Sequence, residues 1–438
     1  MTSTVREMAE RAKSASRRWA TASTEQRNAA VRAAAAAIKR DRQRLLEANE
    51  RDVAAAGTML AGGEITASTL DRLQLTPKKI DEMTQSMLTV ADLPDPVGRV
   101  LQRTELDRGL VLEKITVPLG LLAVIFEARP DAVTQIGALA MKSGNAVILK
   151  PGREVEHTAS ALVELMRKAL KESGLSEDAI GLVEGREAVR ELLEMPDLID
   201  MVIPRGAKQL VEFVQSNTRI PVLGHAEGVC HVYVDATANL PMALDLIDDA
   251  KTDYPAACNS VETVLVHEQI AEVFLPMLAD RLHAKGVKLR GCDKTRLILN
   301  GQPIELVAED EWHCEYSDLE LAVRVVASMD KAIEHIHRYG SLHTEMIVTE
   351  DPAVAERFLA RVDAAGVFHN ASTRFADGYR YGFGAEVGIS TSKLHARGPV
   401  GVEGLTTYKY VLRGAGQVVH SYHASGGKSF THKRLPIE

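Results

Sequence analysis

From Leu119 onward the sequence alternates between short apolar runs and stretches with helical periodicity, and this alternation restricts the possible folds more than any other feature. The first series of strand-like runs lies at 121–126, 146–149, 180–183 and 199–203. Strands that are joined through helices form right-handed crossovers and a parallel sheet. The pattern therefore predicts an α/β unit, and such sheets bind ligands at the carboxyl ends of their strands.

A second series of the same kind predicts a second α/β unit. Its strand-like runs lie at 231–234, 261–266, 287–290, 321–326, 345–348 and 367–369. The chain has 438 residues, which is enough for two or three domains. Two α/β units plus the flanking segments account for that length.

The residues before the first series are rich in alanine and arginine and predict helices. Ser23 and Gln26 have the spacing of a capping box, ahead of a helix that is predicted to run to about Ala48.

Three β-like runs lie outside the two series. The runs 100–106 and 110–115 flank the residues 107–109, which predicts a hairpin with Gly109 at its turn. The run 406–412 is rich in β-branched and aromatic residues. Because an open strand edge favours pairing with another chain, we expect these segments to form a homo-oligomer contact.

Composition excludes several classes of protein. The net charge is −8, which disfavours nucleic-acid binding, and no apolar run approaches the roughly 18 residues of a membrane span. The cysteines are widely spaced and contain no Cys-x-x-Cys pair, so we expect a reducing, cytoplasmic location. They are Cys230, Cys258, Cys292 and Cys314.

Cys258 lies where a nucleophile would be presented. A turn-prone segment, 254–257, precedes it, and the apolar run 261–266 follows it. A thiol at the tip of a loop that a buried strand holds is rigidly positioned, and its thiolate is the reactive form. A buried structural cysteine is the alternative, and this segment alone leaves both possibilities open.

A set of short stretches matches the motifs of one enzyme superfamily. They are Val117–Gly120, Phe126–Pro130, Lys142–Asn145, Ile203–Gly206, Pro221–His231, Ala257–Asn259, Glu262–Thr263, Gly340–Ser341 with His343–Glu345, and Ala396–Pro399. Through them the chain resembles the aldehyde dehydrogenase superfamily over nearly its full length, and within it the branch that acts on γ-glutamyl phosphate. Ser260 and the segment 150–152 depart from the pattern of that branch.

The resemblance implies an aldehyde dehydrogenase-like α/β fold in three parts. Residues 1–98 and 117–227 would form a Rossmann-like cofactor-binding domain, and 228–404 the catalytic domain. Residues 99–116 and 405–438 would form a β oligomerisation arm and a tail.

The resemblance also implies NADPH-dependent reduction of γ-glutamyl phosphate to glutamate 5-semialdehyde and phosphate, in proline biosynthesis. Cys258 would attack the acyl phosphate and form a thioester. Because Ala128 replaces the superfamily's oxyanion asparagine, the backbone N–H groups of Cys258 and Asn259 would support the oxyanion. Glutamate 5-kinase, which makes acyl phosphates of this kind, is the partner that this reaction implies.

Further site residues follow from the resemblance. Lys150 and Arg153 would meet a 2′-phosphate. Gly206 is assigned to the cofactor, and Glu315 to the nicotinamide ribose. Two alternatives stay open: Lys150 and Arg153 could be ordinary surface residues, and Glu315 could be a solvated acid without a ligand. The dinucleotide fingerprint G-x-G-x-x-G is absent, so side chains and helix N-termini would have to hold a nucleotide.

The substrate is expected to bind through Glu127, Arg129 and Arg397, although a structural ion pair is the alternative for each arginine. The main competing function is a hydrolytic aldehyde dehydrogenase. That reaction needs a general-base glutamate where this chain has Gly224, and Glu227 lies three residues further on. A non-catalytic relative is disfavoured because Cys258 is present.

No metal site is expected. Two Cys–His pairs, at 230–231 and 313–314, and one pair of histidines, His335 and His337, lie close in sequence. Adjacent residues point apart, and residues two apart on a helix do not share a face.

Overall fold

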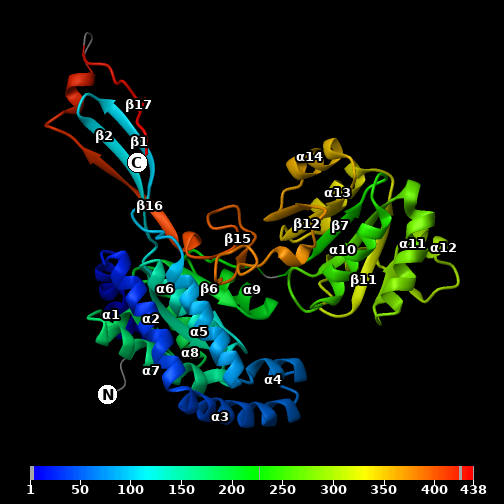
Figure 1. The fold of residues 1–438 in the computed structure, drawn as a ribbon, viewed down its shortest axis with the longest axis horizontal. Coiled ribbons are helices and arrows are strands. Elements are labelled where there is room, and N and C mark those ends of the chain that lie inside the picture. Colours follow the sequence, from blue (N-terminus) through cyan, green and yellow to red (C-terminus); the bar gives the residue numbers. More distant parts are fainter. Residues whose placement is uncertain (1–3, 226, 424–426, 438) are drawn as a thin grey trace. The chain divides into compact units, whose positions relative to one another are not determined.

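A computed structural model describes residues 4–225, 227–423 and 427–437 (Figure 1). Residues 424–426 and 438 of the expected tail lie outside these ranges. The chain forms two compact units. Unit 1 comprises residues 1–223, 383–388 and 400–438, and unit 2, which is inserted into it, comprises 224–382 and 389–399.

Unit 1 contains the first predicted parallel sheet, in the strand order β5-β4-β3-β6. The strands are β3 (Leu121–Phe126), β4 (Ala146–Pro151), β5 (Ile180–Leu182) and β6 (Met201–Arg205). Every residue of β3 and β4 is buried, which explains why the segments 121–126 and 146–149 are unbroken apolar runs in the sequence. The strand order changes direction between β3 and β6, and such a switch point is where open α/β sheets bind ligands.

Unit 1 also contains several α-helices. They are α1 (Val5–Trp19), α2 (Thr24–Arg40), α3 (Arg42–Ala61), α4 (Ala67–Leu73), α5 (Pro77–Asp92), α6 (Pro130–Lys142), α7 (Glu156–Glu172), α8 (Glu187–Leu193) and α9 (Lys208–Ser216). The capping box is confirmed, because Ser23 Oγ accepts from Gln26 N and Gln26 Oε1 accepts from Ser23 N. The helix predicted to run to about Ala48 is wrong: α2 ends at Arg40. Asp41 lies between α2 and α3, and its backbone (φ −97°, ψ 25°) leaves the helical conformation there, although its side chain makes no capping hydrogen bond to α3.

Unit 1 also carries an antiparallel sheet in the order β16-β2-β1-β17. Its strands are β1 (Val100–Asp107), β2 (Leu110–Pro118), β16 (Thr406–Arg413) and β17 (Lys433–Arg434). The predicted hairpin is confirmed, and Gly109 has φ +72°, a backbone conformation that glycine adopts readily. Strand β16 pairs with β2 of the same chain, from Thr406 opposite Pro118 to Arg413 opposite Val111.

Unit 2 contains a seven-stranded parallel sheet in the order β10-β9-β11-β8-β7-β12-β13. Its strands are β7 (Cys230–Val234), β8 (Val261–His267), β9 (Lys288–Gly291), β10 (Ile304–Leu306), β11 (Glu320–Val326), β12 (Thr344–Val348) and β13 (Gly366–His369). Its helices are α10 (Leu240–Thr252), α11 (Glu268–His283), α12 (Asp293–Ile298), α13 (Met329–Tyr339) and α14 (Pro352–Arg361). Side chains of α10 and α11 pack in one apolar cluster, and those of α13 and α14 in another. The second predicted α/β unit is confirmed.

The described helices include none that combines the length and the apolar character needed to cross a membrane.

Candidate active site

The loop between α10 and β8 carries Cys258. The backbone turns twice there, because Ala257 N donates to Tyr254 O (3.1 Å) and Ser260 N donates to Ala257 O (2.8 Å). Ser260 Oγ donates to Ala250 O (3.1 Å), which ties the end of the loop to the last turns of α10. Cys258 is half-buried, whereas Asn259 and Ser260 are buried. The thiol is therefore partly accessible on a backbone that buried neighbours hold.

The side chain of Asn259 fixes this loop to a second segment. Its Nδ2 donates to Ala376 O (2.9 Å), and its Oδ1 accepts from the guanidinium of Arg374. Arg374 also donates from Nε to Asp253, at the other end of the loop (3.1 Å). The Asn259 side chain is thus part of the scaffold, and the oxyanion role assigned to its backbone N–H stays a prediction.

A third segment runs against the backbone of Cys258. A Cβ at Gly228 would overlap the Cys258 carbonyl oxygen, so this approach requires glycine. Cys230 Sγ donates to the same oxygen (3.3 Å), and burial raises the pKa of the Cys230 thiol well above its usual value. Cys230 therefore stays a protonated donor, which leaves Cys258 as the accessible thiol of the two.

Cys258 lies at the amino ends of its parallel strands. It precedes β8, Cys230 begins β7, and His343 directly precedes β12. Ligand sites of parallel sheets usually lie at the opposite edge. The carboxyl-end rule, which predicts a ligand site at the switch point of unit 1, therefore does not locate the thiol of unit 2.

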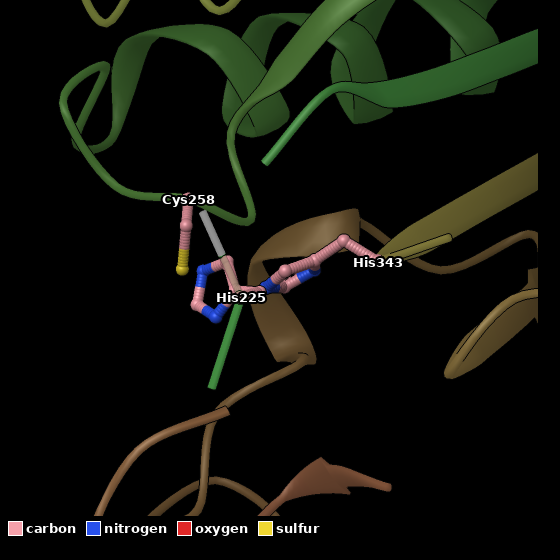
Figure 2. Close-up of side chains that lie close together, drawn as sticks. All are labelled: His225, Cys258 and His343. Atoms are coloured by element: carbon pink, nitrogen blue, oxygen red, sulfur yellow. The ribbon is translucent and has the colours of Figure 1, made fainter. Parts of the chain in front are cut away.

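Two histidines lie beside the thiol. Figure 2 shows the rings of His225 and His343 next to Cys258 Sγ, and one ligand atom from each of the three side chains lies within 4.8 Å of the others. The two rings meet edge to face with their centroids 5.0 Å apart. His225 Nδ1 lies 2.9 Å from Ile389 O, and His343 Nδ1 lies 2.9 Å from Thr344 Oγ1.

A buried ion pair flanks the loop. Lys251, near the end of α10, and Glu262, the second residue of β8, are both 0% exposed and lie 2.8 Å apart, Nζ to Oε2. Burial raises the pKa of Glu262 to about 7, although the Lys251 ammonium opposes this shift. The carboxylate of Glu262 is thus engaged with Lys251 at the base of the loop.

The other assigned residues of unit 2 are Glu315 and Arg397. Glu315 is half-buried in the segment before β11. Arg397 Nη2 lies 3.0 Å from Asp363 Oδ1, and Lys393 also pairs with this carboxylate. The alternative of a structural ion pair therefore describes Arg397 in this structure.

The assigned residues of unit 1 lie at the carboxyl edge of its sheet. Lys150 ends β4, is 7% exposed, and donates from Nζ to Pro151 O (2.7 Å). Burial lowers its pKa, and Glu156, Glu154 and Glu127 oppose the shift. Arg153 is exposed and pairs with Glu64 (2.9 Å).

Glu127, Arg129 and Gly206 surround the switch point between β3 and β6. Glu127 Oε2 accepts from Ala207 N (3.0 Å) before α9, and a Cβ at Gly206 would overlap the Glu127 carboxylate. Arg129 is exposed and precedes Pro130 at the start of α6. Ala128 has φ +48°, a left-handed conformation in which asparagine is several-fold enriched. The structure therefore groups Glu127, Lys150 and Gly206, while Arg153 is paired elsewhere.

Comparison with known proteins decides the family. The aldehyde dehydrogenase family model matches residues 1–294. The gamma-glutamyl phosphate reductase of Natronomonas pharaonis is 50% identical over 438 residues, covering 100% of this chain and 99% of the relative. The crystal structure of gamma-glutamyl phosphate reductase from Thermotoga maritima is 40% identical, with a TM-score of 0.91, covering 95% of this chain and 100% of that chain. The chain belongs to the γ-glutamyl phosphate reductase family.

Membership of the γ-glutamyl phosphate reductase family makes the protein an oxidoreductase, and it confirms the expected superfamily and α/β fold class. The wider family uses NAD or NADP. An acetylating aldehyde dehydrogenase from Geobacillus thermoglucosidasius is 20% identical, with a TM-score of 0.66, covering 94% of this chain and 97% of that chain. This more distant likeness concerns the fold alone.

Sequence reasoning assigned no role to His225 or His343. Both lie inside stretches that match motifs of the γ-glutamyl phosphate reductase branch. That match is the sequence feature that could have marked them as site residues. The two residues are more than a hundred positions apart, so only the fold brings them to Cys258.

Proposed function

We propose that this protein reduces γ-glutamyl phosphate to glutamate 5-semialdehyde and phosphate with NADPH, as a cytoplasmic enzyme of proline biosynthesis. The observation that carries the proposal is the half-buried Cys258, held on a clamped loop in a chain 50% identical along its whole length to a gamma-glutamyl phosphate reductase.

The reaction uses Cys258 twice. Its thiolate attacks the acyl carbon, a C–S bond forms, and the C–O bond to phosphate breaks with its electron pair leaving on phosphate. The backbone N–H groups of Cys258 and Asn259 stabilise the oxyanion that develops. NADPH, when bound, supplies the hydride. The reduced carbon then releases the thiolate back to Cys258 as the aldehyde forms.

The residues at the carboxyl edge of the unit 1 sheet fit a nicotinamide dinucleotide. An ammonium group has three donors, and Lys150 uses one of them on the Pro151 carbonyl, so donors remain for a 2′-phosphate. Arg153 would add a second positive charge after release from Glu64. Gly206 lies where the backbone approaches closely at the switch point, and Glu315 would accept the ribose hydroxyls.

The substrate is anionic at its phosphate and its α-carboxylate. Arg129 is exposed at the start of α6 and is the first candidate to bind it, with Glu127 beside it for the α-amino group. Arg397 would take part only in exchange for its contact with Asp363.

The hydrolytic alternative lacks a base at the position where the superfamily has its glutamate. Gly224 has no side chain, and Glu262 is buried against Lys251. A general base accelerates a step by about 10²–10⁴-fold. Without it, the thioester reacts with phosphate rather than water.

We also propose which enzyme supplies the substrate and which strand forms the contact between subunits. Glutamate 5-kinase makes the acyl phosphate and is the enzyme that supplies the substrate. Strand β16 exposes Tyr408, Tyr410 and Leu412 and provides the contact between copies of the chain.

Replacement of the nucleophile tests the proposal. Cys258→Ala is expected to abolish turnover while circular dichroism and cofactor binding remain unchanged. Cys292→Ser, another half-buried thiol of unit 2, serves as the matched control and is expected to retain activity. Turnover above a small fraction of wild type in Cys258→Ala would remove the thioester from the mechanism.

A further inference from the structure

We propose that Cys258, His225 and His343 form a binding site for a thiophilic divalent cation, of which Zn²⁺ is the prototype, and that the bound metal blocks the nucleophile. Together the three side chains supply one sulfur and two nitrogen ligands, a set that zinc favours. The ligand atoms lie within 4.8 Å of one another. Tetrahedral zinc needs ligand atoms about 3.3–3.6 Å apart, given Zn–S and Zn–N bonds of about 2.3 and 2.0 Å.

The hydrogen bond of His225 prepares its ring as a ligand. A carbonyl oxygen only accepts, so the 2.9 Å contact with Ile389 O requires the proton on Nδ1 of His225. Nε2 then carries the free lone pair. Metal-binding histidines usually make this kind of second contact, which fixes the tautomer and the ring orientation.

His343 supplies an independent observation. Its side chain is 1% exposed, and within the described part of the chain its Nε2 has no hydrogen-bond partner. An unpaired buried polar atom is unfavourable, and a metal ion would satisfy it. Its Nδ1 is already engaged with Thr344 Oγ1, as a ligand of fixed orientation requires. Figure 2 shows this ring beside that of His225.

Closure of the site needs movement of about 1 Å in ligand separation. Cys258 is half-buried at the tip of its loop, whereas His225 is held by its contact with Ile389 O and His343 is buried. Three protein ligands leave a fourth position for water.

Binding replaces the Cys258 S–H bond with an S–Zn bond and releases the proton to solvent. The sulfur lone pair that would attack the acyl carbon is then shared with the metal. Zinc and substrate therefore exclude each other, and a chelator restores activity. Inhibition by zinc rests on the proposed role of Cys258 as the nucleophile, whereas zinc binding itself does not depend on that role.

The test uses the full-length reduced protein without substrate. Titration with Zn²⁺ alone, in competition with a chromophoric chelator, is expected to give one site per chain. Cys258→Ser, His225→Gln and His343→Gln should each weaken it at least tenfold. The matched controls Cys292→Ser and His283→Gln, from the same unit, should stay within twofold of wild type.

Cobalt(II) gives a second readout, because a thiolate-to-metal charge-transfer band reports a Co–S bond. The band is expected in wild type and in Cys292→Ser, and is expected to be lost in Cys258→Ser. A zinc affinity within twofold of wild type in Cys258→Ser or in His225→Gln, or a wild-type protein without the cobalt band, would overturn the site. Should buried His343→Gln not fold, the His225 and Cys258 variants decide. Turnover by Cys258→Ala tests the enzymatic role separately, since metal binding is measured without catalysis.

Discussion

The ion pair between Lys251 and Glu262 is expected to be the main support of the Cys258 loop. Both side chains are 0% exposed, and they flank the loop on its two sides at 2.8 Å. Lys251→Met keeps most of the stem and removes the ammonium. Because the buried carboxyl group loses the ammonium that favours its charged form, we expect the free energy of unfolding at pH 8.5 to fall by about 2 kcal/mol, since each pH unit above the wild-type pKa adds about 1.4 kcal/mol.

The penalty is expected to depend on pH. In the folded wild type the pKa of Glu262 is raised from 4.5 to about 7, so its stabilising contribution is complete below pH 4.5 and is lost as pH rises through 7. Without Lys251, which lowers this pKa, the carboxyl holds its proton to higher pH. At pH 6 Glu262 is then largely neutral in both proteins. The difference between variant and wild type should therefore be small at pH 6 and grow toward pH 8.5.

Urea unfolding that reports unit 2 alone measures this difference. The chain has two tryptophans, Trp19 in unit 1 and Trp312 in unit 2. In a Trp19→Phe background the fluorescence of Trp312, which is buried, follows unit 2. Lys331→Met breaks a pair whose side chains are 62% and 65% exposed and should leave the free energy of unfolding almost unchanged. A Lys251→Met penalty that matches this control, or one that does not change with pH, would refute the reasoning.

Three further predictions concern catalysis and assembly. Lys150→Ala should weaken NADPH binding at least tenfold and NADH binding little, whereas Arg153→Ala should have a smaller effect because Arg153 pairs with Glu64; equal losses for both cofactors by fluorescence titration would contradict the assignment. Oxidation of glutamate 5-semialdehyde by NADP⁺ should be near zero without phosphate and rise saturably with it, and rapid phosphate-free formation of glutamate would instead favour hydrolysis with Glu227 as base. Light scattering at micromolar concentration should show an oligomer that Tyr410→Lys shifts toward monomer, and a monomeric wild type would contradict the proposed contact.

The fold was largely predictable because its signals are local. Strands β3 and β4 are buried on both faces, so that residues 121–126 and 146–149 are continuous apolar runs. Gly109 marked the hairpin turn, and Ser23 marked the start of α2. The missed elements have weaker signals: β10 is largely exposed, and the break at Asp41 depends on a single residue in an otherwise helical stretch.

The candidate site was predictable only in part. Cys258 has a local signal, since a turn precedes it and a strand follows. His225 and His343 have none, because their proximity depends on how β7, β8 and β12 are aligned in the sheet. The pairing of Arg397 with Asp363 likewise depends on tertiary structure. Sequence patterns reveal chemistry within one segment, and the fold determines which segments meet.

The pairing of β16 with β2 also determines the order in which parts of the nascent chain can fold. Between Pro118 and Thr406 the ribosome adds roughly 290 residues, which takes about 15–60 s at ordinary rates of synthesis. During this interval the β1–β2 hairpin can form, but the edge of β2 that β16 will occupy has no partner from its own chain. Both segments of unit 2, 224–382 and 389–399, are synthesised within the same interval. Unit 2 can thus fold before β16 and β17, the last strands of unit 1, have been synthesised.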